Sequence, residues 1–88
     1  MKDEKSIDRV IQVQDINIGH NIKKYRELKK LKQTDIVKQL QLSGIDVSIY
    51  SYNRIEKGTQ NPTVSFLLAI CKLLDCDMND IFGLNKNP

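Results

Sequence analysis

The chain has 88 residues, with 14 Lys and Arg against 11 Asp and Glu, which gives a formal net charge of +3. This length supports one domain with a single core and excludes a large active-site cleft between two domains. No stretch has the length and apolarity of a signal peptide or of a membrane-spanning helix, so we expect a cytoplasmic protein that does not bind membranes.

The basic residues are concentrated in the middle of the chain. Residues 19–60 hold nine Lys and Arg and four Asp and Glu, whereas the segments on either side each carry a net charge of −1. An excess of positive charge confined to one segment is typical of a surface that binds a polyanion.

The residue types that usually bind metals or carry out catalysis do not form a recognisable site. Cys71 and Cys76 are five apart, a spacing that fits neither a zinc knuckle nor a redox Cys-x-x-Cys, and we interpret them as reduced core residues. His20 is the only histidine, and the carboxylates of residues 75–80 lack the spacing and the closing Glu of a calcium loop. We therefore expect no metal, no cofactor and no catalytic residues, and hence a protein that is not an enzyme.

We divide the chain into an arm, a helical domain and a tail. The arm, residues 1–15, has no assigned structure, because its apolar run from Val10 to Val13 suits a helix and a strand equally well. The domain, residues 16–84, is predicted to be all-α, with helices over residues 18–28, 33 to 40 or 42, 49–57, 64–74 and 78 to about 82. Residues 85–88 form the tail.

Residues that favour helix ends support these boundaries. Side chains that can accept hydrogen bonds from a first helical turn stand at Asp15 or Asn17, Ser48, Thr63 and Asp77. Glycines that permit a left-handed stop stand at Gly44, Gly58 and Gly83. The predicted second and third helices then form a helix-turn-helix unit, in which the third helix is short and polar on one face.

The order and spacing of these signals resemble the phage-repressor/Cro-type helix-turn-helix domain, also called the XRE family. The matching residues are Ile18-Gly19, Ile22, Arg26, Leu31-x-Gln33, Ile36-Val37, Val47-Ser48, Ile55-Glu56-x-Gly58, Asn61-Pro62, Leu74 and Asp77. The resemblance covers residues 18–82 and implies a compact five-helix bundle that binds double-stranded DNA through its third helix.

The resemblance also implies which side chains touch DNA. Base-reading positions are Ile49, Tyr50, Ser51, Asn53 and Arg54. Phosphate-contacting positions are Gln33, Thr34, Ser48, Lys57, Thr59 and Asn61. Arg usually pairs with guanine, Asn suits adenine and an apolar group can lie on a thymine methyl, whereas phosphate contacts give affinity without sequence information. A solvated helix face is the alternative interpretation of the base-reading positions. Arg26 and Glu56 match a structural ion pair of the family.

Two segments depart from the family pattern. Residues 41–47 separate Leu40 from Ser48 where about three or four residues are usual, which leaves the entry angle of the third helix open. We expect Leu42, Ile45 and Val47 to anchor this longer turn.

The second departure is in the fourth helix, where a core stripe and a second apolar stripe overlap. The expected core stripe is Val64, Leu67, Leu68, Cys71 and Leu74. The second stripe is Phe66, Ala69, Ile70 and Leu73, which we interpret as a dimer interface, joined by Ile7, Val10 and Ile11 of the arm. A thicker core within one chain is the alternative.

These features lead to a functional hypothesis. We expect a sequence-specific transcriptional regulator, and a repressor in particular, that binds a pseudo-palindromic operator as a homodimer, with half-sites roughly 34 Å apart. The alternative is an antitoxin or adaptor module that holds a protein partner through the arm or the fourth helix.

Overall fold

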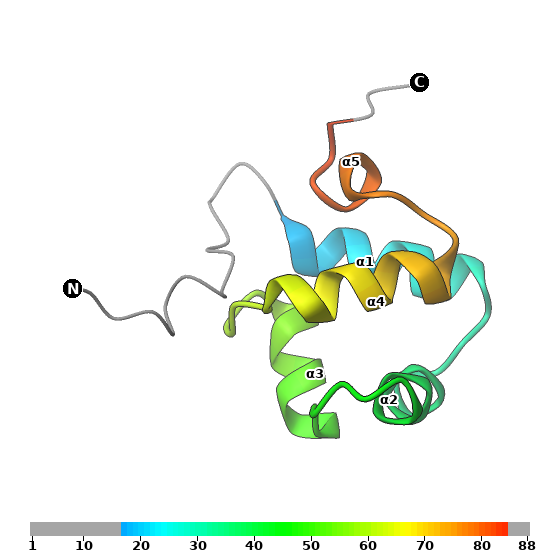
Figure 1. Ribbon diagram of the computed structural model, residues 1–88. Helices are drawn as coiled ribbons and strands as arrows, with labels where there is room; N and C mark the ends of the chain where they lie inside the picture. Colours follow the sequence, from blue (N-terminus) through cyan, green and yellow to red (C-terminus); the bar gives the residue numbers. More distant parts are fainter. Residues whose placement is uncertain (1–16, 85–88) are drawn as a thin grey trace.

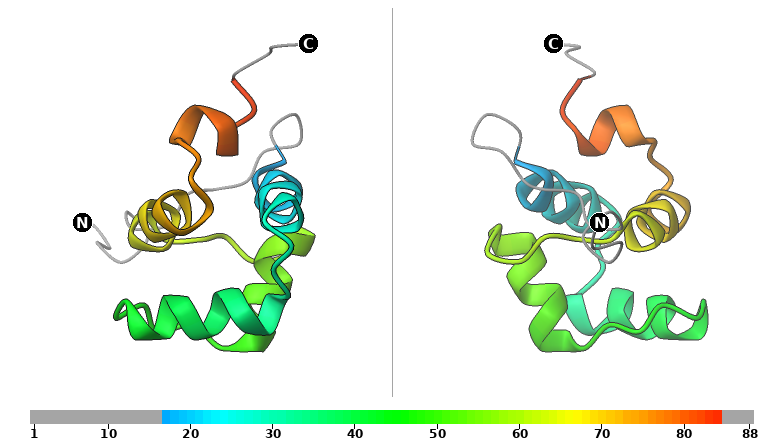
Figure 2. Two further views of the ribbon diagram at one scale, coloured as in Figure 1. Left: turned by 90° about the vertical axis from the view of Figure 1, so that its right-hand side faces the viewer. Right: turned by 60° about the vertical axis from the view of Figure 1, so that its left-hand side comes forward.

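The computed structural model describes residues 17–84, which form an all-helical bundle as predicted (Figure 1). Its helices are α1 (Ile18–Leu28), α2 (Gln33–Leu42), α3 (Ile49–Lys57), α4 (Val64–Leu74) and α5 (Met78–Ile81). In Figure 2, α1 and α4 lie side by side, α2 and α3 lie on one side of this pair, and α5 lies on the other. The arm, with Ile7, Val10 and Ile11, and the tail fall outside the described residues.

Local hydrogen bonds explain where the helices begin. The side chains of Asn17, Ser48, Thr63 and Asp77 each accept a hydrogen bond from the backbone N–H three residues later. At α2 the direction is reversed, because the carboxylate of Asp35 accepts from the backbone N–H of Lys32. The predicted starts of α1, α3, α4 and α5 are therefore confirmed, with Asn17 as the cap of α1.

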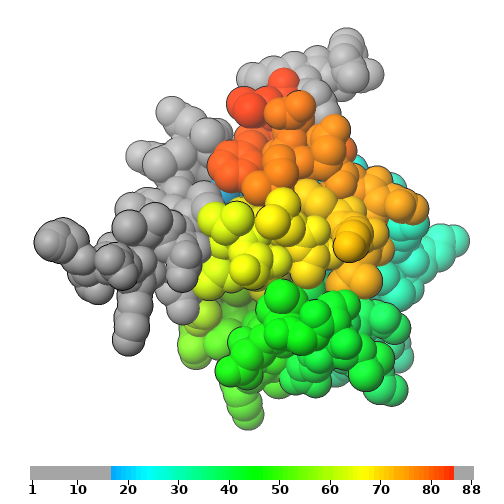
Figure 3. Space-filling view, viewed as in Figure 1, coloured from blue at the N-terminus to red at the C-terminus, as the bar shows by residue number. Residues whose placement is uncertain are grey.

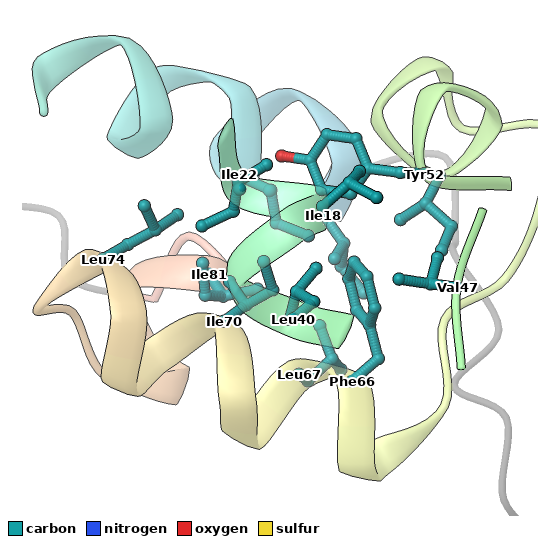
Figure 4. Packing of buried hydrophobic residues seen from close by; sticks show 13 residues of the cluster. Ile18, Ile22, Leu40, Val47, Tyr52, Phe66, Leu67, Ile70, Leu74 and Ile81 are labelled. Atoms are coloured by element: carbon teal, nitrogen blue, oxygen red, sulfur yellow. The ribbon is translucent and has the colours of Figure 1, made fainter. Parts of the chain in front are cut away.

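The core lies where α1, α3 and α4 meet, and every helix contributes to it (Figure 4). The rings of Tyr52 and Phe66 are tilted against each other with their centroids 6.0 Å apart. Ile81 is fully buried and fixes the short helix α5 over α1. Burial of these side chains supplies most of the free energy that holds the bundle together.

The buried side of α4 includes residues that the sequence analysis assigned to a dimer interface. Phe66 and Ile70 are 2% and 0% exposed and lie in the core of their own chain. The prediction that these two residues lie in a dimer interface is therefore wrong, because both are buried in the core of their own chain. Ala69 and Leu73, the other members of that stripe, are partly buried at the edge of the core.

The predicted core stripe of α4 is also corrected. Leu67 and Leu74 are buried as expected, but Leu68 is 57% exposed and Val64 is 41% exposed. The buried side of α4 is thus centred between the two stripes, because α1, α2 and α5 pack against it from different directions.

The connection between α2 and α3 runs over residues 43–48, since α2 continues to Leu42. Gly44 adopts a φ of +88°, which an L side chain rarely tolerates, and this starts the turn. Val47 is buried, and its carbonyl oxygen accepts a hydrogen bond from Nε2 of Gln41 at 2.9 Å. Leu42 is 76% exposed, so the expectation that it anchors the turn is wrong, whereas Ile45 and Val47 do pack inward.

Candidate nucleic-acid interface

The two sides of α3 differ sharply. Tyr52, Ile55 and Glu56 point inward and are buried. Tyr50, Arg54 and Lys57 follow one another at the i, i+4, i+7 spacing of a single helical face, and all three are exposed. The inner side therefore holds the helix in place, and the outer side presents one ring and two cations to solvent.

A buried ion pair ties α3 to α1. Nε of Arg26 donates to Oε2 of Glu56 at 2.7 Å, and Nη2 donates to Oε1 at 3.2 Å. The third guanidinium nitrogen, Nη1, donates to the carbonyl oxygen of Leu31 at 2.6 Å. The two side chains matched to the family's ion pair are thus joined by a bidentate contact, which fixes their relative geometry.

Further hydrogen bonds complete the surroundings of the Glu56 carboxylate. The hydroxyl of Tyr52 donates to Oε2, and Nε2 of Gln33 donates to Oε1 at 2.9 Å. Burial alone would raise the pKa of Glu56, but the hydrogen bonds from Arg26, Tyr52 and Gln33 outweigh it and hold the pKa below its ordinary value. Burial together with the Glu56 carboxylate raises the pKa of Tyr52 far above its usual range. Glu56 is therefore ionised and Tyr52 is neutral at physiological pH.

The same network extends to the outer side of α3. Oε1 of Gln33 accepts a hydrogen bond from Nδ2 of Asn53 at 3.1 Å. One amide at the start of α2 is thus held between Glu56, which faces inward, and Asn53, which is expected to read a base. The sequence did not predict this link, because it joins residues that are 20 positions apart on different helices.

α1 and α3 also approach each other unusually closely at Gly19. A Cβ atom added there would overlap the backbone carbonyl oxygens of Ile55 and Glu56. Only glycine allows this packing, which brings the α3 backbone against α1 directly beside the ion pair. Gly19 is therefore a structural residue of the contact between α1 and α3. In the sequence it was recognised only as part of the family pattern.

The end of α3 and the following turn carry polar groups on the same surface. Gly58 has a φ of +84° and ends the helix, and the backbone N–H of Thr59 donates to the carbonyl oxygen of Arg54 at 2.9 Å. Nε of Arg54 donates to Oε1 of Gln60 at 3.1 Å, which orients the guanidinium. Lys57 and Thr59 are exposed, and Asn61 is partly buried.

A protein-family model described as helix-turn-helix matches residues 22–81 of the chain. The chain belongs to the helix-turn-helix family. Its type is that of the XRE regulators, related to the Cro and C1 repressors, and this is a family of DNA-binding regulators rather than of enzymes. No curated protein and no solved structure matches the chain.

Within this helix-turn-helix, three expected base-reading residues lie off the outward row, and one of them is Asn53, which is partly buried and hydrogen bonded to Gln33. Ser51 is partly buried and borders a hollow of about 130 Å³ together with Val47 and Thr63. Ile49 is partly buried beside Val37 of α2. The structure therefore separates Ser51 and Ile49 from Tyr50 and Arg54, which the sequence had grouped together.

The expected phosphate-contacting residues occupy two places. Thr34 is exposed on the first turn of α2, next to Gln33, and the hydroxyl of Ser48 caps α3 by accepting from the backbone N–H of Ser51 at 3.1 Å. Lys57, Thr59 and Asn61 lie at the other end of α3, at its last turn and in the segment that follows.

Across residues 17–84, no three or more His, Cys, Asp and Glu side chains are arranged to hold a metal ion. None of the helices in the same range is long and apolar enough to cross a membrane.

Proposed function

We propose that this DNA-binding regulator is a sequence-specific repressor that binds a pseudo-palindromic operator as a homodimer in the cytoplasm. The observation that carries the proposal is the outward row of Tyr50, Arg54 and Lys57 on a helix whose other side is locked into the core. A short helix held rigidly with its polar side exposed is what the major groove of B-DNA can admit.

The side chains of Arg54, Asn53 and Tyr50 each suit a different part of the groove. The guanidinium of Arg54 can donate two hydrogen bonds to O6 and N7 of a guanine, and Gln60 already restrains its orientation. The amide of Asn53 donates one hydrogen bond to Gln33, and its oxygen and second N–H can pair with an adenine. The ring of Tyr50 is 76% exposed and can lie on a thymine methyl.

Phosphate contacts would fix α3 in the groove from both ends. Lys57, Thr59 and Asn61 would touch the backbone beyond the end of α3, and Thr34 and Ser48 would touch it near the starts of α2 and α3. Because the Gln33 amide is hydrogen bonded on both of its polar atoms, we assign it mainly to positioning Asn53. The backbone N–H groups at the start of α2 remain suited to an anion.

We place the homodimer interface on the outer side of α4. Leu68, Ala69, Lys72 and Leu73 border a hollow of about 390 Å³ with Ser43, on the face that α4 covers in Figure 3. A second copy is the occupant that fits the proposed function, because one short reading helix makes few base contacts and two coupled helices make twice as many. This surface replaces the stripe that contained Phe66 and Ile70.

The alternative of an antitoxin or adaptor rests on the same exposed apolar side chains, together with Leu42. A protein partner of a different sequence could cover them. The two proposals differ in solution: the repressor is a dimer by itself, whereas an adaptor is a monomer until its partner is added.

Selection of DNA from a pool of random duplexes tests the proposal. The full chain should enrich one pseudo-palindromic motif whose half-sites lie about one helical turn apart, and sedimentation should show two chains per duplex. Leu68→Glu should leave the helical content unchanged and yield a monomer that binds the selected duplex more weakly. Equal binding of all duplexes would contradict sequence-specific recognition, and a single chain per duplex would contradict the homodimer.

A further inference from the structure

Three sulfur-containing residues lie where α4 passes into α5. Cys71 lies in the last turn of α4, Cys76 lies in the connection, and Met78 is the first residue of α5. The thiol of Cys71 donates to Sδ of Met78 at a sulfur–sulfur distance of 3.6 Å, and the Cys76 thiol lies close enough to that of Cys71 for the two to affect each other's pKa. The recognition of DNA by α3 makes no use of this cluster.

The backbone holds the cluster together. Asp75 ends α4 with a φ of +55°, and the backbone N–H of Cys76 then donates to the carbonyl oxygen of Cys71 at 3.0 Å. This turn brings the second cysteine back over the first. Asp77 then caps α5 and sets the position of Met78. The path of the backbone therefore brings the Cys76 and Met78 residues back beside Cys71.

The separation between the sulfurs of Cys71 and Met78 fits a metal ion that both of them bind. Metal–sulfur bonds of about 2.3 Å in a trigonal arrangement place the sulfurs about 4 Å apart. The observed separation of 3.6 Å between Cys71 and Met78 therefore needs only a small adjustment. Two thiolates and a thioether are soft donors, which select Cu(I) over harder divalent ions. All three side chains are partly buried against the core, so an ion there would be shielded from water.

We propose that Cys71, Cys76 and Met78 bind one Cu(I) ion per chain. On binding, each thiol gives up its proton and forms a sulfur–copper bond, the thioether donates a lone pair, and the copper stays in the +1 state. Two protons are released and no electron is transferred. Burial, and to a smaller extent the carboxylates of Asp77 and Asp80, raise the pKa of both thiols, so loss of the two protons depends on the metal. The same carboxylates add negative charge around the site, which favours a bound cation.

Occupation of the site would join α4 to α5 more firmly. α5 is only four residues long, and it is otherwise held by the buried Ile81 and by a hydrogen bond from Nδ2 of Asn21 to the carbonyl oxygen of Ile81 at 2.8 Å. A metal bridge between Cys71 and Met78 would add a constraint that closes this part of the bundle. We therefore expect Cu(I) to raise the melting temperature of the folded chain.

Competition with a chromophoric Cu(I) chelator, under anaerobic and reducing conditions, tests the site in the full chain. One Cu(I) per folded chain should be withdrawn from the chelator, with release of about two protons. X-ray absorption should then show three sulfur neighbours at about 2.3 Å. Retention of no Cu(I) by the folded chain, or an absorption spectrum dominated by oxygen and nitrogen neighbours, would overturn the proposal.

Two variants and a matched control identify the ligands. Cys76→Ser should abolish competition with the chelator. Met78→Leu keeps an apolar side chain of similar size and should lower the affinity about tenfold or more, with an unchanged circular dichroism spectrum. Asn79→Ala alters the adjacent exposed residue and should have no effect. The same affinity in Met78→Leu as in the unaltered chain would overturn the three-sulfur site.

Discussion

The two sides of α3 differ in their surroundings, although their residues alternate along one short helix. On the inner side, Tyr52 and Glu56 are held by hydrogen bonds that lead to Arg26 on α1. On the outer side, Tyr50 and Arg54 are exposed to solvent, and Nε of Arg54 donates a hydrogen bond to Oε1 of Gln60. Under the proposed function, folding stability and DNA recognition are therefore separable on one nine-residue helix. Substitutions on the inner side should unfold the bundle, and those on the outer side should change binding alone.

The two sides are connected at one point. Gln33 holds the inner Glu56 with its amide nitrogen and the outer Asn53 with its amide oxygen. Asn53 is therefore the base-reading candidate whose position depends most directly on the buried network. We expect changes at Gln33 to affect stability and binding together, unlike changes at Tyr50 or Arg54.

The largest effect should come from Glu56→Ala. It leaves the Arg26 guanidinium buried without its anion and removes the acceptor for Tyr52 and Gln33, and loss of one partner of a buried pair costs about 3–5 kcal/mol. Urea denaturation followed by circular dichroism measures this change. Lys57→Ala, at the adjacent exposed position, is the control and should change the free energy of unfolding by less than about 0.5 kcal/mol. Similar values for the two variants would contradict the separation of the two sides.

Gly19→Ala should also destabilise the fold, by about 3 kcal/mol, the upper part of the range for an overpacked core. The added methyl group would meet two backbone carbonyl oxygens of α3, and backbone atoms cannot move aside as a flexible side chain can. The melting temperature of Gly19→Ala, measured by thermal unfolding, checks the effect. The control is His20→Ala, which changes the adjacent, exposed residue. An unchanged melting temperature in Gly19→Ala would mean that α1 and α3 can separate freely.

Tyr52→Phe should have a smaller effect, about 2 kcal/mol, because it removes one hydrogen bond to a charged acceptor and keeps the ring in the core. Tyr52→Phe should also change how the free energy of unfolding depends on pH. The pKa of Glu56 is lowered in the fold, so the stability that this carboxylate contributes is present above the ordinary pKa of Glu and is lost as the pH falls through the lowered value.

In Tyr52→Phe one of the hydrogen bonds that lower the Glu56 pKa is missing, so the pKa in the fold lies closer to its ordinary value, and the acid-induced loss should be smaller and complete at a higher pH than in the unaltered chain. Urea denaturation of both proteins between pH 7 and about 3 tests this. Parallel pH profiles would show that the hydroxyl does not contribute to the ionisation of Glu56. In Glu56→Gln the side chain cannot ionise, so the contribution of residue 56 to the pH dependence of the free energy of unfolding should nearly vanish.

The helix boundaries could be predicted because they depend on neighbours in the sequence. Ser48, Thr63 and Asp77 cap the helices that directly follow them, and Gly58 takes the left-handed conformation where α3 ends. The site residues Arg26 and Glu56 could be paired only by resemblance to the family, because nothing between residues 26 and 56 specifies that their helices meet.

The packing of α4 could not be predicted from periodicity. Its apolar residues surround the helix almost completely, so the sequence pattern is compatible with several buried sides. Which side is buried depends on the helices that pack against α4. Phe66 is buried because Tyr52 lies opposite, a contact that no local signal reveals. The role of Gln33 was missed for the same reason, since both of its partners are on α3.

Base reading by the outer side of α3 is tested most directly by Arg54→Ala. Its affinity should be measured by titration on the selected duplex and on a random duplex, beside Lys57→Ala, which is expected to contact phosphate. Arg54→Ala should lose about 1–3 kcal/mol on the selected duplex and little on the random one, whereas Lys57→Ala should lose similar amounts on both. Equal losses on both duplexes in Arg54→Ala would contradict the account.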